Sequence, residues 1–138
     1  MKAPGFVHLR LHTEYSLSDG MVTLPALMQK ATTFGMPALA VTDKSNLYAT
    51  VKFYQAAFAA GIKPIIGVDV CVLEEKESSC LTLLCQNQQG YQNLLKLVSL
   101  SYLQGQASGK PHIQKSCPVS RISVQQWQIR LACELYRK

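Results

Sequence analysis

Short apolar runs alternate with helical patterns along most of this chain, and this alternation restricts its fold more than any other feature. Strand patterns are predicted at residues 6–13, 37–43, 63–72 and 80–85, and helix patterns at 23–35, 46–60 and 91–102. Strands separated by helices of roughly 10–15 residues indicate βα units around a parallel sheet. We therefore expect an α/β fold in which parallel strands alternate with helices. Four strands are too few to close a parallel barrel, which needs about eight, so a partial (βα) barrel is predicted.

Each predicted helix has an apolar stripe that we expect to pack against the sheet. The stripes are Leu24, Leu27, Met28 and Ala31 in the first helix, Leu47, Val51, Tyr54 and Phe58 in the second, and Leu94, Leu95, Val98 and Tyr102 in the third. Thr23 is a candidate N-cap of the first helix, and Gly35 ends that helix. Residues 74–79 are interpreted as a charged surface loop, and Met21, Met28 and Met36 as core-filling side chains.

The composition is typical of a single globular domain, with 138 residues, 48% of them hydrophobic and 16% charged. No run approaches the ~20 apolar residues of a membrane span, and no signal peptide is predicted. The five cysteines form no CxxC pair, which favours reduced thiols and a cytoplasmic location.

Positive charge is concentrated near the end of the chain. Residues 1–115 contain ten Lys or Arg and seven Asp or Glu, a net charge of +3, whereas residues 116–138 contain four and one, also +3. We therefore predict one domain over residues 1–115 and a basic C-terminal tail over 116–138. Within this tail, a helical spacing relates the apolar residues Val124, Trp127, Leu131 and Leu135.

Polar side chains follow the predicted strands at the ends where α/β proteins place their chemistry. His12 and Asp19 follow the first strand, Asp43 and Lys44 follow the second, and Asp69 lies within the third strand or near its end. Because the carboxyl ends of parallel strands meet at one edge of a sheet, we expect these five side chains to form one site.

The first predicted strand also contains two imidazoles on one side. Strand alternation places His8, Arg10 and His12 on the same face. Imidazoles so spaced and followed by a carboxylate are typical of a metal-dependent hydrolytic site. The middle position departs from this pattern, because the guanidinium of Arg10 has no lone pair to offer a cation.

Several separate blocks of the chain together resemble one known family, the PHP (polymerase and histidinol phosphatase) domain at the N-terminus of bacterial DNA polymerase III alpha subunits. The blocks that match in order and spacing are His8–Gly20, Gly35–Asp43, Asn46–Tyr48, Phe53–Tyr54, Gly61–Gly67 and Gly90–Leu94. The resemblance spans roughly residues 5–115 and implies a barrel of the PHP type. After about residue 115 it fades, which suggests a truncated gene, a change of reading frame or a divergent tail.

The resemblance also implies which positions correspond to metal ligands. The H-x-H pair falls on Arg10 and His12, and the aspartate of S-x-x-D-G is Asp19. An aspartate–histidine pair falls on Asp43 and Lys44, and a ligand glutamate corresponds to the shorter Asp69.

Two imidazoles of the family are thus replaced by cations, which donate hydrogen bonds but cannot ligate. We interpret these six positions as a vestigial metal site held by ion pairs to Asp19, Asp43 and Asp69, with no catalytic residue and no cofactor. An active site would instead hold zinc, manganese or magnesium on His12, Asp19, Asp43 and Asp69, with His8 as an additional ligand. At the position of Cys80 relatives often have histidine, and His112 is interpreted as a solvent-exposed residue of a connector.

The resemblance implies a part in DNA replication, as the scaffold region of a DNA-directed DNA polymerase, a nucleotidyltransferase. Its expected partners are other replicase subunits, above all the proofreading exonuclease, with DNA contacted only indirectly. The polymerase active site lies well beyond the PHP region in this family, so this chain alone is not expected to polymerise DNA. Two alternatives stay open, a stand-alone PHP-type metal-dependent phosphoesterase and a non-functional gene fragment.

Overall fold

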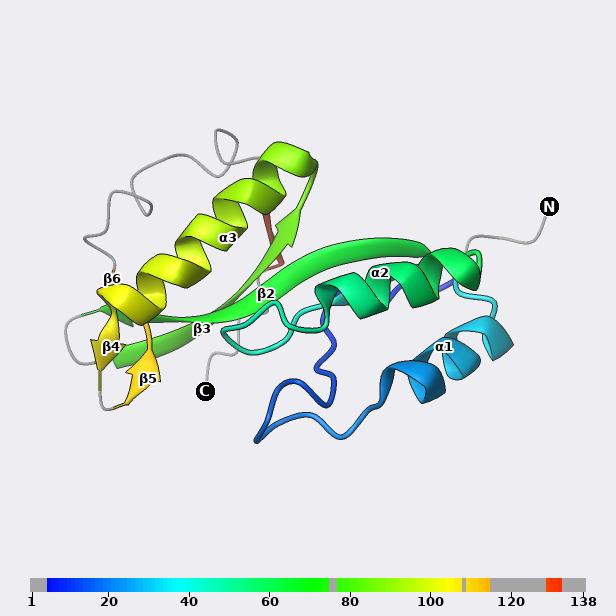
Figure 1. Ribbon diagram of the computed structural model, residues 1–138, viewed down its shortest axis with the longest axis horizontal. Helices are drawn as coiled ribbons and strands as arrows, with labels where there is room; N and C mark the ends of the chain where they lie inside the picture. Colours follow the sequence, from blue (N-terminus) through cyan, green and yellow to red (C-terminus); the bar gives the residue numbers. More distant parts are fainter. Residues whose placement is uncertain (1–4, 75–76, 108, 115–128, 133–138) are drawn as a thin grey trace.

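The computed structural model describes residues 5–74, 77–107, 109–114 and 129–132, and its centre is an open mixed sheet around one long strand (Figure 1). That strand, β2 (Lys63–Glu74), pairs in parallel with β1 (Ala38–Val41) and β6 (Ile113–Gln114), and antiparallel with β3 (Glu77–Cys85). β3 pairs in turn with β7 (Ile129–Ala132), and β4 (Gln106–Ala107) with β5 (Lys110–Pro111) form a separate ribbon. The predicted α/β class with an incomplete sheet is confirmed.

The first two helices pack beside the β1 end of the sheet. α1 (Leu24–Thr33) begins after Thr23 and buries the predicted stripe, and a left-handed Gly35 (φ 63°) follows its end. α2 (Thr50–Ala59) contacts both α1 and β2. Together with β1 they form the first hydrophobic core: Leu24, Leu27, Met28, Ala31, Leu39, Val41, Ala49, Phe53, Ala57 and Ile62.

A second core forms where α3 (Gln88–Leu103) covers the β2–β3 hairpin. Its buried members are Val68, Val70, Leu83, Leu94, Leu97 and Ile113. Asn87 caps this helix, because its side chain accepts the Gly90 N–H at 3.0 Å. Figure 1 shows α3 beside one end of β2, and α1 and α2 toward the other end.

The β2–β3 hairpin is longer than the sequence predicted. The strands extend to Glu74 and Glu77, so the charged loop expected at residues 74–79 is reduced to the short connection between them. This connection also explains why the pair is antiparallel, since a parallel pair needs a crossover of about a dozen residues or more.

The first extended segment is not the regular strand predicted at residues 6–13. The Ala40 N–H donates to the His8 carbonyl and the Thr42 N–H to the Leu11 carbonyl, each at 2.9 Å. Three steps along this segment thus oppose two steps along β1, which leaves one extra residue bulged out of the ladder. The Leu11 N–H donates to Thr42 Oγ1 at 2.9 Å, a side-chain oxygen in place of a backbone carbonyl.

For the second helix, the predicted buried face was wrong. It buries Thr50, Phe53 and Ala57, while Val51, Tyr54 and Phe58 of the predicted stripe are exposed. Both faces of α2 are apolar, so periodicity alone could not show which face meets the sheet.

Three further predictions were wrong in detail. Met21 was expected in the core but is 95% exposed, and His112 was expected in solvent but is buried, with Nδ1 2.8 Å from the Lys110 carbonyl. Around Leu131 the chain forms strand β7 where a helix was expected, because it pairs with β3. The rest of that expected helix lies outside the described residues. In the described part of the chain, no helix is long and apolar enough to cross a membrane.

Candidate functional site

Asp69 lies at the centre of a cluster of polar side chains on β2. Its Oδ2 accepts the Arg10 Nε–H at 2.7 Å and lies 2.7 Å from His12 Nε2, while Thr82 Oγ1 donates to its Oδ1. The carboxylate is only 3% exposed. A buried carboxylate needs donors on both oxygens, and this one has a guanidinium, an imidazole and a hydroxyl.

Asp43 occupies a second buried position next to the first. The backbone N–H of Thr13 donates to its Oδ1 at 2.6 Å, the Thr13 hydroxyl to its Oδ2 at 2.8 Å and the Ser16 hydroxyl to its Oδ1 at 2.7 Å. Asp43 is 2% exposed, and no cation contacts it among the described residues. The ion pair predicted for Asp43 is therefore wrong, because neutral donors from the loop after residue 12 already satisfy the carboxylate.

The backbone brings these two carboxylates together at the carboxyl end of β1. The Asp69 N–H donates to the Asp43 carbonyl at 3.1 Å, and the Ser45 N–H donates to the Asp69 carbonyl at 2.7 Å. Ser45 has a positive φ of 55°, which turns the chain away from the sheet directly after Lys44. Asp43 thus follows the end of β1 as predicted, whereas Asp69 lies inside β2, which continues to Glu74.

Lys44 and Asp19 form the outer part of the cluster. Lys44 Nζ lies 2.8 Å from Asp19 Oδ2, and both side chains are 42% exposed. Hydrogen bonding and the positive charge of Lys44 lower the pKa of Asp19, and the same hydrogen bond raises the pKa of Lys44. Gly20 follows Asp19 where a side chain would collide with the Thr13 carbonyl, so only glycine lets the loop close here.

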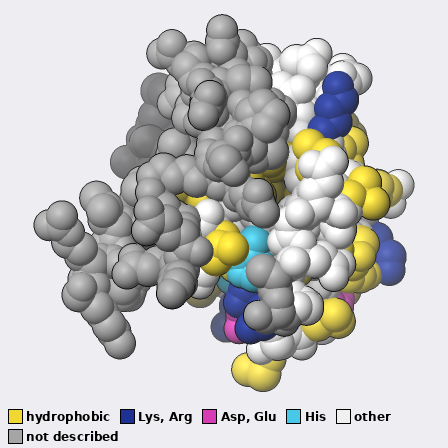
Figure 2. Space-filling model, turned by 90° about the vertical axis from the view of Figure 1, so that its left-hand side faces the viewer, with side chains coloured by type: hydrophobic (Ala, Val, Ile, Leu, Met, Phe, Trp, Pro, Cys, Tyr) yellow, Lys and Arg dark blue, Asp and Glu magenta, His cyan; other side chains and the backbone are white. Residues whose placement is uncertain are grey.

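His8 lies outside the cluster, which corrects the prediction that it shares a face with Arg10 and His12. Its ring is exposed and meets the Phe6 ring edge to face at 4.7 Å. The bulge before Leu11 shifts the alternation by one residue, so His8 no longer lies on the side of the other two. Figure 2 shows where histidine, cationic and acidic side chains gather on one face of the molecule.

The donor set in this arrangement does not fit a divalent metal ion. Asp19, Asp43 and Asp69 each already accept a hydrogen bond from a side chain or the backbone, and His12 Nε2 lies against the Asp69 carboxylate. Arg10 and Lys44 bring two positive charges to the same place, and neither has a lone pair. In residues 5–74, 77–107, 109–114 and 129–132, no group of three or more His, Cys, Asp and Glu side chains could hold a metal ion.

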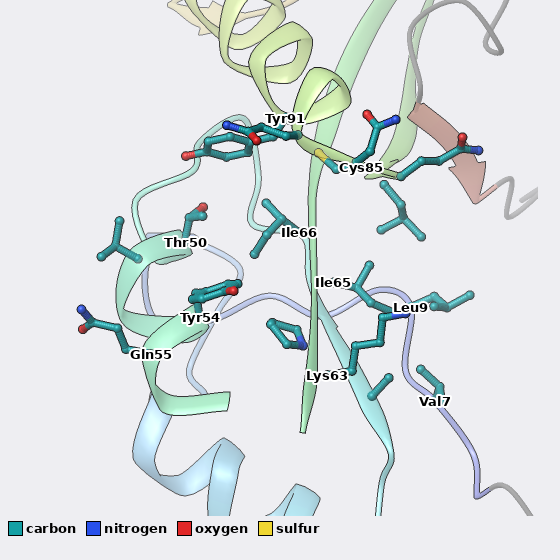
Figure 3. A pocket seen from close by; sticks show the side chains of 17 residues that line it. Val7, Leu9, Thr50, Tyr54, Gln55, Lys63, Ile65, Ile66, Cys85 and Tyr91 are labelled. Carbon is teal, nitrogen blue, oxygen red and sulfur yellow. The ribbon is translucent and has the colours of Figure 1, made fainter. Parts of the chain in front are cut away.

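A separate open groove of about 1380 Å³ lies away from these residues. Its described lining is mostly apolar and includes Leu9, Tyr54, Ile66, Cys85 and Tyr91, and it contains none of the six predicted site positions. Figure 3 shows Tyr54 of α2 and Tyr91 of α3 on its wall, on either side of Ile66. The predicted site positions gather in the carboxylate cluster and not in this groove, so the cluster is the better candidate site.

The PHP domain model matches residues 8–134, which include the whole carboxylate cluster. The chain belongs to the PHP domain family. It is 48% identical over 118 residues to the DNA polymerase III subunit alpha of Escherichia coli strain K12, and 44% identical over 119 residues to that of Vibrio cholerae. The match to the Pseudomonas aeruginosa subunit is 48% over 113 residues. These alignments cover 80–84% of this PHP chain but only 10% of each relative.

Solved structures with the same fold are more distant in sequence. A putative metal-dependent phosphoesterase from Bifidobacterium adolescentis superposes with a TM-score of 0.56 at 16% identity, covering 74% of this chain and 35% of that one. An amidohydrolase from Chromobacterium violaceum with bound sulfate and no metal also gives 0.56, at 22% identity, covering 69% and 32%. These similarities support the fold of the PHP chain and nothing finer.

Sequence reasoning missed the hydroxyl groups of this PHP site. Thr13 and Ser16 lie between the predicted site residues His12 and Asp19, and a hydroxyl beside a buried carboxylate could have been anticipated there. Thr82 had no such signal, because its contact with Asp69 depends on the register of the β2–β3 hairpin.

Proposed function

We propose that this chain is the PHP region of a bacterial replicative DNA polymerase alpha subunit whose vestigial metal site has become structural. The observation behind the proposal is that Arg10 and Lys44 each pair with a carboxylate of the cluster, at 2.7 and 2.8 Å. Metal-binding PHP domains, which this chain resembles, have histidine at these two positions. A guanidinium and an ammonium there neutralise the carboxylates that would otherwise attract a divalent ion.

In this proposal the PHP region acts in DNA replication as a scaffold. The high identity to alpha subunits supports the polymerase setting, although the aligned part is 10% of those proteins. The chain would hold its part of the subunit in shape and contact other replicase subunits, the proofreading exonuclease first among them. The division into a domain over 1–115 and a tail over 116–138 also stays a proposal.

Metal content tests the loss of the ancestral site. The purified chain, incubated with zinc or manganese and desalted, is expected to retain no stoichiometric metal and to leave p-nitrophenyl phosphate intact. Arg10→His/Lys44→His is expected to retain more metal than the unmodified chain, because it supplies lone pairs and removes two charges. Lys52→His is a matched control, since Lys52 bonds the Tyr15 hydroxyl away from the carboxylates.

Stoichiometric metal in the unmodified chain would contradict the structural reading and favour the PHP-type phosphoesterase instead. The scaffold role needs its own measurement, co-elution of the chain with the purified exonuclease subunit in size-exclusion chromatography. Failure to co-elute would remove this partner from the proposal without affecting the metal result.

A further inference from the structure

Two cysteines face each other across the β2–β3 hairpin. Cys71 in β2 is the direct partner of Cys80 in β3, and Asp69 pairs with Thr82 two residues further along the same strands. Side chains alternate between the faces of a strand, so both thiols lie on the face that holds the Asp69 cluster.

The backbone already holds these two residues at disulfide distance. Directly opposed residues of an antiparallel pair have Cα atoms about 4.5–5.5 Å apart, and disulfides bridge Cα atoms about 4.4–6.8 Å apart. The strand register therefore places the two cysteines within the range of Cα separations that disulfides span.

Access to the pair is one-sided. Cys80 is exposed and Cys71 is half-buried, and both are free thiols. A small oxidant from solvent would thus meet Cys80 first, with Cys71 beside it on the neighbouring strand as the second thiol.

We propose that Cys71 and Cys80 form a reversible redox site that reacts with hydroperoxides to give a cross-strand disulfide. The Cys80 thiolate attacks one peroxide oxygen, an S–O bond forms, and the O–O bond breaks. With hydrogen peroxide, the leaving hydroxide takes up the proton that Cys80 lost and becomes water. Cys71 sulfur then attacks Cys80 sulfur, the S–S bond forms, and the S–O bond breaks. The hydroxide released leaves as water with the Cys71 proton.

In sum, two thiols lose two electrons, and one hydrogen peroxide is reduced to two waters. A dithiol reductant reverses the reaction by exchange, as expected for an exposed disulfide. The new bond ties β2 to β3 beside the Asp69–Thr82 pair. It thereby limits the opening of the hairpin at the cluster.

Peptide mapping of the full chain after treatment with hydrogen peroxide tests the site. Total free thiols, measured after denaturation, are expected to fall from the five of the sequence to three. Trypsin should then release peptides 53–76 and 77–96 as one cross-linked species that dithiothreitol separates. Amide exchange in the hairpin should become slower in the oxidised chain and recover on reduction.

Cys85 is the matched control, because it shares peptide 77–96 with Cys80. It lies five residues after Cys80 in β3, an odd number that places it on the opposite face, and burial raises its pKa to about 11. Cys85→Ser should leave the cross-link unchanged, and Cys80→Ser should abolish it. A cross-link that survives in Cys80→Ser, or peroxide treatment that leaves all five thiols or over-oxidises Cys80 without joining the two peptides, would overturn the proposal.

Discussion

The inner carboxylates of the cluster, Asp43 and Asp69, and the outer carboxylate, Asp19, obtain their hydrogen-bond donors in different ways. Asp43 and Asp69 are almost fully buried, and each is satisfied by three side-chain or backbone groups. Asp19 is 42% exposed and pairs with Lys44. Burial therefore sets how many donors the protein must supply, because solvent can complete the shell of an exposed carboxylate but not of a buried one. The two cations of the cluster are accordingly not equivalent: Arg10 serves a buried carboxylate, and Lys44 an exposed one.

The largest effect is expected from Asp43→Ala. This change leaves the Thr13 N–H and the hydroxyls of Thr13 and Ser16 without their acceptor in a buried place. We expect the free energy of unfolding to fall by about 3–5 kcal/mol, measured by urea denaturation followed by circular dichroism. Asp19→Ala is the control, and equal stability of the two variants would break the distinction between inner and outer carboxylates.

A smaller effect is expected from Arg10→Met, which removes the guanidinium from Asp69 but keeps much of the side-chain volume. Arg10 itself is 43% exposed, so solvent screening reduces the expected loss of unfolding free energy to about 1–3 kcal/mol. Arg10→Lys should lose less, because it keeps the charge. A variant Arg10→Met that unfolds at the same urea concentration as the unmodified chain would show that His12 and Thr82 suffice for Asp69.

Lys44→Met should change the urea midpoint less than Arg10→Met does. Exposed ion pairs contribute little, because solvent screens them and both side chains lose conformational freedom. The same urea titration measures the difference between the two variants. A loss as large as that of Arg10→Met would mean that the outer pair also supports the fold.

The smallest effect is a pH dependence in the outer pair. Lys44 lowers the pKa of Asp19 in the folded chain, so the pair is fully formed above the ordinary aspartate value of about 3.9. Its contribution is lost as the pH falls through the lowered pKa. Carboxyl-carbon NMR of Asp19 should show this titration, and Lys44→Met should return it toward the ordinary value. An unchanged Asp19 titration in Lys44→Met would contradict the assignment of the shift to Lys44.

The sequence predicted the elements better than their packing. The stripe of α1 was predicted correctly because Leu24, Leu27 and Met28 form its only apolar face. The face of α2 was not, because Val51, Tyr54 and Phe58 compete with a second apolar face of the same helix. Which face of α2 becomes buried depends on where the sheet lies, and the local sequence contains no information about that position.

The site shows the same division between local and distant information. The meeting of Asp43 and Asp69 followed from the parallel pairing of β1 with β2, and the ion pairs of Arg10 and Lys44 followed from charge. The neutral cage around Asp43 and the contact of Thr82 with Asp69 depend on loop closure and hairpin register. These are set by contacts between residues far apart in the chain, so no spacing rule could predict them.

The extra residue between His8 and Leu11 has a consequence for comparing relatives of this chain. In a sequence alignment, His8 and His12 both look like candidate ligands of the first segment. Only His12 reaches Asp69, whereas His8 contacts the Phe6 ring. A relative that lacks the bulge could place its histidine at the column of His8 inside the cluster, with no change in residue type. In this family, gap placement in the first segment therefore determines which histidines count as inherited ligands.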